Sequence, residues 1–400
     1  MMISKAMKKQ LEGNSTIRLM FQEGKDMAKK VGAENVFDFS IGNPNVPAPK
    51  EVNESIKTIV DEVDSVYLHG YMANEGYPET RQAIAEHLNR RFGTSYGVGN
   101  ILMIAGAAAG LNIALKALLD EGDEVITFRP YFLEYGNYVR NYGGVLRTVP
   151  TDKETFLPDM EELRSAISEK TKAVIINTPN NPTGAIYGEE TLRELSSLLS
   201  EESRKYGTHI VLISDEPYRE LCYDGLTQPW VAAFYPDTIV CYSFSKSLSL
   251  PGERIGYCVV PDELCCHEDI YSCMSIANRT LGMVNAPSLM QKVIERCIDT
   301  DISENVKAYD RNRKLLYGIL KEAGFEAAYP QGAFYIWIKT PEGLTDQEFC
   351  NICKRHYVLI VPGSSFEGSG HMRAAYCVSE DTIRRSEQAW KDIASECGLR

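Results

Sequence analysis

Residues capable of chemistry follow the apolar segments of this chain. Asn181 comes after AVIINT, Asp215 directly follows HIVLIS, and Lys246 comes soon after TIVCY. A neutral lysine amine is a nucleophile, a buried carboxylate can hold a positive charge in place, and an amide both donates and accepts hydrogen bonds. We therefore predict that these side chains belong to one site.

The segments that must position these residues alternate between short apolar runs and helical patterns from about residue 100 to 260. This alternation is typical of an α/β sheet with helices on both faces, and continuous apolar strands indicate burial on both sides. Such sheets bind ligands at the carboxyl ends of their strands, which is where the candidate residues lie. The expected strands are 101–106, 124–128, 145–150, 173–178, 209–215, 238–244 and 254–260.

A second pattern follows a helical, charge-rich stretch at 288–323. Strands are expected at 334–339, 357–361 and 372–378, with helices at 345–354 and up to 396, which together favour a smaller α+β unit. A proline-rich segment near 45–52 marks the crossing from an N-terminal arm. We expect residues 1–50 to form the arm and part of the small domain, 51–310 the large domain, and 311–400 the small C-terminal domain. The site should lie between the domains.

The composition argues against several classes of partner. The formal net charge of −13 would repel nucleic acids and anionic membranes. The 11 cysteines all lie beyond residue 221, which disfavours a disulfide framework and favours a reducing cytoplasm. The first residues contain no apolar run that could serve as a secretory signal or a membrane span.

Metal-ligand patterns are weak in this sequence. Cys350 and Cys353 form a CxxC, but they lie on a predicted amphipathic helix without a second pair, so we interpret them as core residues. The six histidines show no ligand spacing. We predict no metal.

Three motifs carry a family resemblance: SDEPY, NTPNNPTG and SFSKSLSLPGERIGY. Together they resemble the fold-type I aminotransferases of classes I and II, and matching segments extend from about residue 36 to 378. The resemblance implies pyridoxal 5′-phosphate (PLP) as the cofactor and a mostly parallel central sheet flanked by helices. It also implies a homodimer with shared active sites.

The resemblance assigns three catalytic roles. Lys246 matches the lysine that forms a Schiff base with PLP, and its amine must be neutral to do so. Asp215 matches the carboxylate beneath the pyridine nitrogen, where its charge keeps that nitrogen protonated. Tyr218 matches a residue that bonds the phenolic oxygen of PLP, a role shared with Asn181.

Further matches concern the phosphate and the ring of the cofactor. Many relatives carry Ser, Thr or Lys in the turn GAAAG, whereas this chain has only Gly and Ala there, so backbone N–H groups must suffice at the start of the helix expected at 108–119. Phe132 matches the aromatic residue stacked on the ring, and Tyr71 matches a tyrosine that reaches the phosphate in the neighbouring subunit. The expected phosphate ligands of the same chain are Gly106, Ala107, Ala108, Ser243, Ser245 and Arg254.

The substrate contacts come from both ends of the chain. Arg373 matches the arginine that clamps the substrate α-carboxylate, and Gly42 matches the glycine whose N–H approaches it. Asn181 is expected to contact the substrate as well. Arg279 lies near the place where some aspartate-specific relatives carry a second arginine, but a surface arginine is an equal interpretation.

The resemblance predicts a ping-pong aminotransferase. An L-amino acid, either aspartate-like, aromatic or of broad range, would donate its amine to a 2-oxo acid such as 2-oxoglutarate. A C–S β-lyase or a decarboxylase on the same scaffold is the alternative. A non-catalytic module fused to a DNA-binding domain is disfavoured, because only about 35 residues precede the matched region.

Overall fold

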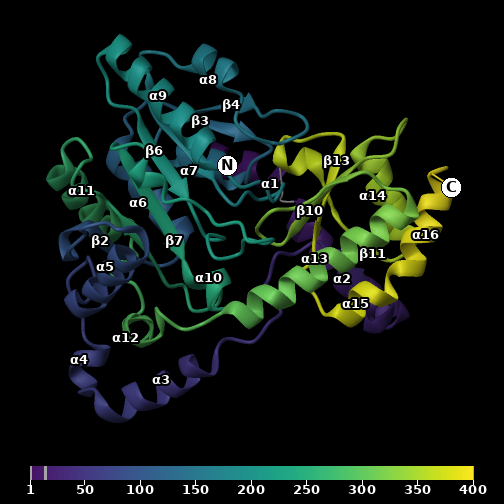
Figure 1. Ribbon diagram of the computed structural model, residues 1–400, viewed down its shortest axis with the longest axis horizontal. Coiled ribbons are helices and arrows are strands. Elements are labelled where there is room, and N and C mark those ends of the chain that lie inside the picture. The colour runs from purple at the N-terminus through teal and green to yellow at the C-terminus, as the bar shows by residue number, and fades with distance from the viewer. Residues whose placement is uncertain (1, 13–15, 400) are drawn as a thin grey trace.

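Seven strands form the central sheet of this α/β protein, for which a computed structural model describes residues 2–12 and 16–399 (Figure 1). Neighbouring strands run parallel from β4 to β7, whereas β8 runs antiparallel to both β7 and β2. The order across the sheet is β2 (Ile101–Ile104), β8 (Gly256–Val259), β7 (Thr238–Ser243), β6 (Val211–Asp215), β5 (Thr171–Asn177), β3 (Glu124–Arg129) and β4 (Val145–Pro150).

Helices cover both faces of this sheet, as continuous apolar strands require. Alternate strand residues point to opposite sides, so Ile104 and Ile175 pack in one hydrophobic core while Met103 and Ile176 pack in two others. One face carries α6 (Ala107–Leu118), α7 (Glu134–Asn141) and α11 (His267–Thr280). The other carries α3 (Lys50–Glu62), α5 (Pro78–Phe92), α8 (Met160–Ala166), α9 (Glu189–Tyr206) and α12 (Ser288–Cys297).

A smaller antiparallel sheet builds the second part of the molecule. Its strands, in order, are β12 (Val361–Pro362), β13 (His371–Ala375), β10 (Tyr335–Lys339) and β9 (Ala327–Ala328). Its core includes residues of α13 (Ser303–Ala323), α14 (Asp346–Arg355), α15 (Glu380–Arg385) and α16 (Glu387–Glu396). In Figure 1 the long helix α13 runs from the large sheet toward this part.

The N-terminal segment joins this smaller part rather than the large sheet. β1 (Phe37–Asp38) pairs in parallel with β11 (Val358–Leu359), and Phe39 is fully buried in the same core. The remaining helices are α1 (Lys5–Glu12), α2 (Thr16–Val31), α4 (Ser65–His69) and α10 (Phe244–Ser247). Short 3-10 turns occupy Ala33–Asn35, Val98–Asn100, Val231–Ala233 and Gly363–Phe366.

The predicted elements differ from the structure mainly where one expected strand or helix is divided into two. The expected strand 357–361 is divided at Ile360, so that β11 and β12 belong to different sheets. The helical stretch 288–323 is interrupted before α13, where the Asp301 carboxylate accepts a hydrogen bond from the Ser303 N–H. Charge periodicity does not reveal this local hydrogen bond. The expected boundary between residues 310 and 311 falls inside α13.

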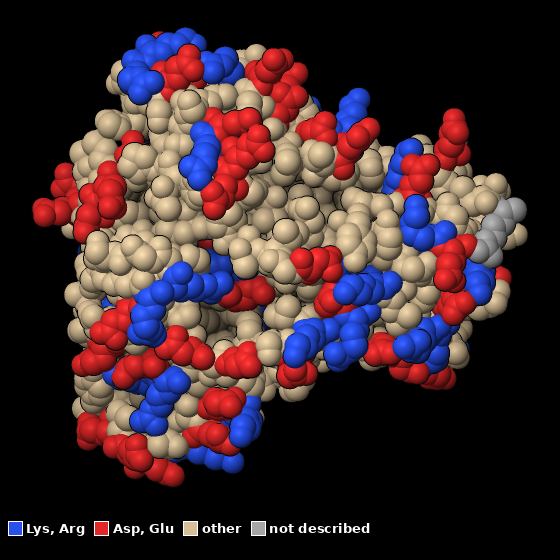
Figure 2. Space-filling view, viewed as in Figure 1, with Lys and Arg blue, Asp and Glu red and all other residues tan. Residues whose placement is uncertain are grey.

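Two smaller predictions can be compared with the described residues. Cys350 and Cys353 are both buried on α14, as expected for core positions. Among residues 2–12 and 16–399, no helix is long and apolar enough to cross a membrane. On the face shown in Figure 2, lysine and arginine side chains are interspersed with acidic ones.

Candidate active site

The carboxyl ends of three neighbouring strands bring the candidate residues together. Asn177 at the end of β5 is in register with Asp215 at the end of β6, and its side-chain amide donates to the Asp215 carbonyl at 2.9 Å. A cavity of about 320 Å³ opens beside them. The predicted residues that line it are Gly42, Ala107, Ala108, Phe132, Asn181, Asp215, Tyr218, Ser243, Ser245, Lys246, Arg254 and Arg373.

Lys246 reaches into this cavity from α10, the single turn that follows β7. Its Nζ donates to the Gly42 carbonyl oxygen at 2.8 Å, a contact that spans 204 positions of sequence. Burial lowers the pKa of Lys246 to about 8, against an opposing effect of the nearby Cys377, and the charges of Arg373 and Arg254 lower it further. Near pH 7 the neutral amine, the form that a nucleophile requires, is therefore far more populated than in an ordinary lysine.

Asp215 presents a carboxylate oxygen that needs a partner. The residue is buried, and burial raises the pKa of Asp215 to about 7. The Tyr135 hydroxyl donates to its Oδ2 at 2.5 Å, which opposes the rise, while Oδ1 is buried without a hydrogen-bond partner among the described residues. A buried anionic oxygen is costly unless it is paired, so this position suits a cationic N–H.

Another part of the cavity lining suits an anion. Gly106 caps α6 with a φ of 85°, a conformation that favours glycine, and a Cβ at this position would overlap the Arg254 guanidinium. Arg254 donates to the carbonyl oxygens of Ala105 and Pro251, at 3.1 and 2.9 Å. Its own φ of 53° is unusual for a non-glycine residue. A guanidinium beside the N-terminus of α6 provides charge and N–H donors for a phosphate.

Two serines extend this anion-binding part of the lining. The Ser243 and Ser245 hydroxyl oxygens lie 2.6 Å apart, and both side chains are buried. The Ser243 oxygen also accepts from the Ser245 N–H at 3.2 Å and caps α10. Their hydroxyl protons can rotate, so either serine can turn a donor toward an anion in the cavity.

Arg373 is held rigidly on the side of the cavity formed by the small sheet. Its two terminal nitrogens donate to Asn181 Oδ1 at 3.1 Å and to the Ser40 carbonyl at 2.7 Å. The guanidinium lies over the rings of Tyr335 and Phe366, at 4.4 and 4.7 Å from their centroids. These contacts fix the plane of the guanidinium, which is the condition for bidentate binding of a carboxylate.

Tyr218 and Phe132 complete the walls of the cavity. The Tyr218 and Tyr335 hydroxyls are hydrogen-bonded at 2.9 Å. Phe132 stands edge-on to Tyr135, with ring centroids 5.8 Å apart and an interplanar angle of 85°. Gly42 is also constrained, because a Cβ there would overlap the Tyr335 hydroxyl.

Some predicted residues lie outside this group, and some residues were missed. Gly106 abuts the Arg254 guanidinium but does not line the cavity, and neither does Tyr71, which is 95% exposed on the loop before α5. Arg279 is exposed on the last turn of α11. The cavity also uses Asn177 and Tyr335, which could not be recognised from sequence because both lie within strands that are typical of core.

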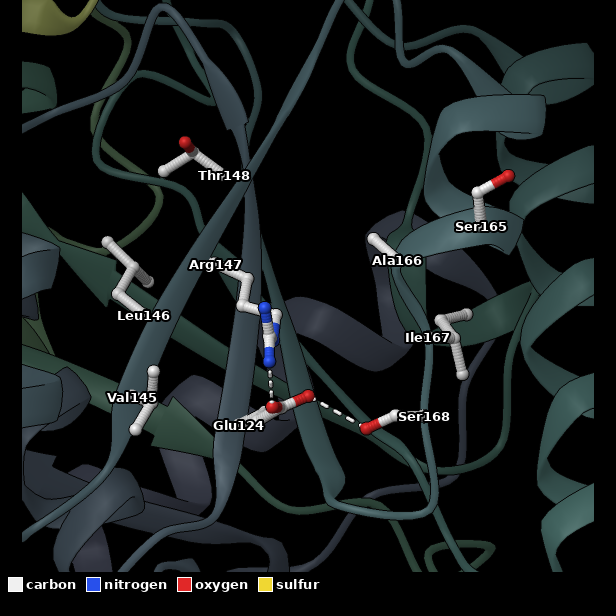
Figure 3. A pocket seen from close by; sticks show the side chains of 9 residues that line it. All are labelled: Glu124, Val145, Leu146, Arg147, Thr148, Ser165, Ala166, Ile167 and Ser168. Carbon is white, nitrogen blue, oxygen red and sulfur yellow. Dashed lines mark hydrogen bonds and ion pairs between the residues drawn. The ribbon is translucent and has the colours of Figure 1, made fainter.

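A larger and more open hollow, of about 490 Å³, lies between β4 and α8 (Figure 3). Its charges are already paired: Arg147 contacts the Glu124 carboxylate at 2.5 Å, and the Ser168 hydroxyl donates to the same carboxylate at 2.8 Å. None of the predicted site residues lines it. The described residues also contain no group of three or more His, Cys, Asp and Glu arranged to hold a metal ion.

Comparisons with known proteins agree with this geometry. A sequence model of the family described as aminotransferase class I and II matches residues 34–388. An aspartate aminotransferase from Pyrococcus horikoshii is 30% identical, with 92% of each chain covered, and an aromatic-amino-acid aminotransferase from Thermococcus litoralis is 30% identical, with 96% of each chain covered. A solved amino transferase from Eubacterium rectale is 46% identical, covers 99% of each chain and superposes with a TM-score of 0.95.

Proposed function

We infer the reaction from the premise that this chain belongs to the aminotransferase class I and II family, whose members depend on PLP, and is an aminotransferase. We propose that it binds PLP in the 320 Å³ cavity and transfers an amino group from an L-amino acid to a 2-oxo acid. When bound, PLP supplies an aldehyde and an electron-poor ring that withdraws electrons from the substrate Cα.

The observation that carries this proposal is the pairing of two buried groups with complementary needs. Asp215 Oδ1 is unpartnered and suits the ring nitrogen of the cofactor, while the Lys246 amine has a lowered pKa and suits its aldehyde. Both line one cavity. Groups with perturbed pKa values that meet in a cavity favour a catalytic site over a structural ion pair.

Each remaining wall of the cavity would hold one part of the cofactor. Arg254, Ser243 and Ser245 would bind the phosphate together with the backbone N–H groups of Ala107 and Ala108. Phe132 would pack against the ring. Tyr218 and Asn181 would donate hydrogen bonds to the phenolic oxygen.

The chain also provides for the substrate. Arg373 would clamp the α-carboxylate with both terminal nitrogens, and the Gly42 N–H would approach the same group. This clamp orients the Cα–H bond, and a free Lys246 amine beside it can then remove and return the proton. The group that would carry the proton is thus the Lys246 amine, which already lies in the cavity with its Nζ 2.8 Å from the Gly42 carbonyl oxygen.

The cationic residues that line the cavity and the names of the relatives together suggest the class of substrate. Among the described residues, the cationic side chains lining the cavity are Lys246, Arg254 and Arg373, and each has a task above. We propose aspartate-like and aromatic amino acids as donors and 2-oxoglutarate as acceptor, in keeping with relatives named for aspartate and for aromatic amino acids. Arg279 of a second subunit is the candidate to bind a side-chain carboxylate.

We further propose a homodimer and movable domains. Tyr71 is 95% exposed and would reach the phosphate bound by the partner. Residues 51–310 would form the large domain and 311–400, together with part of 1–50, the small one. Their separate cores support two domains, and α13, which crosses residue 310, packs in the core of the small one. Movement of the small domain would bring Arg373 onto the substrate.

A nitrogen balance tests the reaction type. The purified holoenzyme is given one ¹⁵N-labelled amino acid at a time, followed by 2-oxoglutarate. The proposal predicts one equivalent of 2-oxo acid per site before the acceptor is added, and the label in glutamate afterwards. Label appearing in ammonia, or release of CO₂ from the donor, would instead support a C–S β-lyase or a decarboxylase.

A further inference from the structure

Tyr135 is the residue on which the ionisation of Asp215 depends most directly. It lies in the first turn of α7, fully buried, and 80 positions of sequence separate it from Asp215. Its hydroxyl donates to Asp215 Oδ2 at 2.5 Å. Rings on two sides hold it: Phe132 edge-on at 5.8 Å, and Tyr131 stacked at 6.3 Å.

The geometry divides the two carboxylate oxygens between two tasks. Tyr135 occupies Oδ2, so Oδ1 alone remains free among the described residues, and Asp215 lines the cavity. The backbone of Asp215 is also fixed, since its carbonyl accepts from the Asn177 amide at 2.9 Å. These two hydrogen bonds therefore fix the orientation of the carboxylate before a ligand binds.

The other titratable groups around Asp215 do not take the place of the hydrogen bond from Tyr135. Glu216 is the nearest acid along the chain, and it is committed to the Arg219 guanidinium at 2.6 Å. Tyr138 and Tyr218 face Asp215 only as neutral phenols, because burial raises both of their pKa values. Burial raises the pKa of Tyr135 as well, so it stays a hydrogen-bond donor over the working pH range.

We propose that Tyr135 is a positioning residue that keeps the Asp215 carboxylate ionised, so that the proton between Asp215 and the ring nitrogen of a bound pyridine stays on nitrogen. The proposal rests on the proposed PLP function. A buried carboxylate and a pyridine nitrogen compete for one proton. A hydrogen bond donated to the carboxylate stabilises its charged form and so leaves the proton more often on the nitrogen. Without that bond the proton moves toward Asp215, and the ion pair becomes a weaker neutral contact.

The test uses the apo protein and two cofactors that differ in one atom. Dissociation constants are measured for PLP and for its 1-deaza analogue, in which carbon replaces the ring nitrogen. Tyr135→Phe should weaken PLP binding about tenfold, the equivalent of one pKa unit. Binding of the deaza analogue should change less than about twofold. Tyr138→Phe, which removes a hydroxyl one turn away without breaking a bond to Asp215, should leave both constants unchanged.

Other outcomes separate the inference from the proposed function. If Tyr135→Phe weakens both cofactors equally, or neither, Tyr135 has only a structural role and the inference is overturned. If the wild-type protein does not bind PLP, the proposed function itself fails. Replacing Tyr135 with 3-fluorotyrosine preserves the ring and strengthens the donor, so it avoids a folding defect. It should increase the preference for PLP over the deaza analogue, and an unchanged preference would also contradict the inference.

Discussion

At the scale of single residues, the site depends on two buried groups whose pKa values move toward each other. Burial lowers the pKa of Lys246 to about 8 and raises that of Asp215 to about 7. The same desolvation acts on opposite charges, so it favours the neutral form of each group. A bound cofactor would use the neutral amine and restore the charge of the carboxylate.

The lowered pKa of Lys246 predicts the pH profile of cofactor attachment. Only the neutral amine attacks an aldehyde, so the attachment rate of PLP to the apo protein should rise about tenfold per pH unit below 8 and level off above it. The measurement is the rate of the absorbance change on mixing at a series of pH values. A rate that keeps rising to pH 10 would show an ordinary lysine pKa.

The raised pKa of Asp215 predicts a stability effect of opposite sign to that of most carboxylates. The folded apo protein holds this proton up to about pH 7, whereas the unfolded chain releases it near pH 4. Stability is therefore lost as the pH rises through this window. Apo Asp215→Asn should exceed the wild type by a few kcal/mol at pH 8 and by much less at pH 4, measured by urea unfolding. An equal difference at both pH values would exclude the effect.

The sequence predicted the residues with distinctive chemistry and missed those whose role depends on a contact. Lys246 and Asp215 follow apolar strands and stand in motifs that resemble a known family, so both could be predicted. Tyr135 and Tyr335 are aromatic residues in a helix and a strand, where such side chains are usually core. Only the fold shows that their hydroxyls meet Asp215 and Tyr218.

At the scale of elements, the turn between β2 and α6 would determine how closely the phosphate of the proposed cofactor can approach. Gly106 has a φ of 85° and abuts Arg254, so Gly106→Ala adds both backbone strain and a clash. We expect it to weaken PLP binding more than tenfold and to cost about 1 kcal/mol or more of stability. Gly93→Ala is the matched control, since Gly93 has a φ of 70° with open space around it.

In that comparison, both variants should lose stability because both place a Cβ on left-handed backbone. Only Gly106→Ala should lose PLP affinity, measured by titration of the apo protein. Equal affinity in the two variants would remove the β2–α6 turn from the phosphate site.

The sequence predicted the seven strands of the large sheet because most of them are short apolar runs that alternate with helical patterns. The breaks at Ile360 and before α13 were not predictable. The first depends on β11 and β12 pairing in different sheets, and the second on a local hydrogen bond between Asp301 and Ser303. The carboxyl ends of β5 and β6, which bear Asn177 and Asp215, lie side by side as the α/β pattern indicated.

At the scale of the whole molecule, the proposed dimer predicts complementation between two defective chains. Lys246→Ala removes the amine from its own site, and Tyr71→Ala would remove a phosphate contact from the partner's site. A mixed dimer then holds one site with both defects and one intact site. Refolding the two variants together should recover up to about a quarter of wild-type activity, because mixed pairs form about half of the dimers.

The alternative gives a different result. If Tyr71 served its own subunit, each site of the mixed dimer would carry one defect, and mixing would recover no activity. Tyr71 is exposed and does not line the cavity of its own chain, which favours the shared arrangement.

Borohydride reduction shows whether the amine of Lys246 holds the cofactor, as proposed. The holoprotein is reduced, digested and analysed by mass spectrometry. We expect a pyridoxyl group on the peptide that contains Lys246 and none in Lys246→Ala. A reduced cofactor attached to another lysine, or to none, would contradict it.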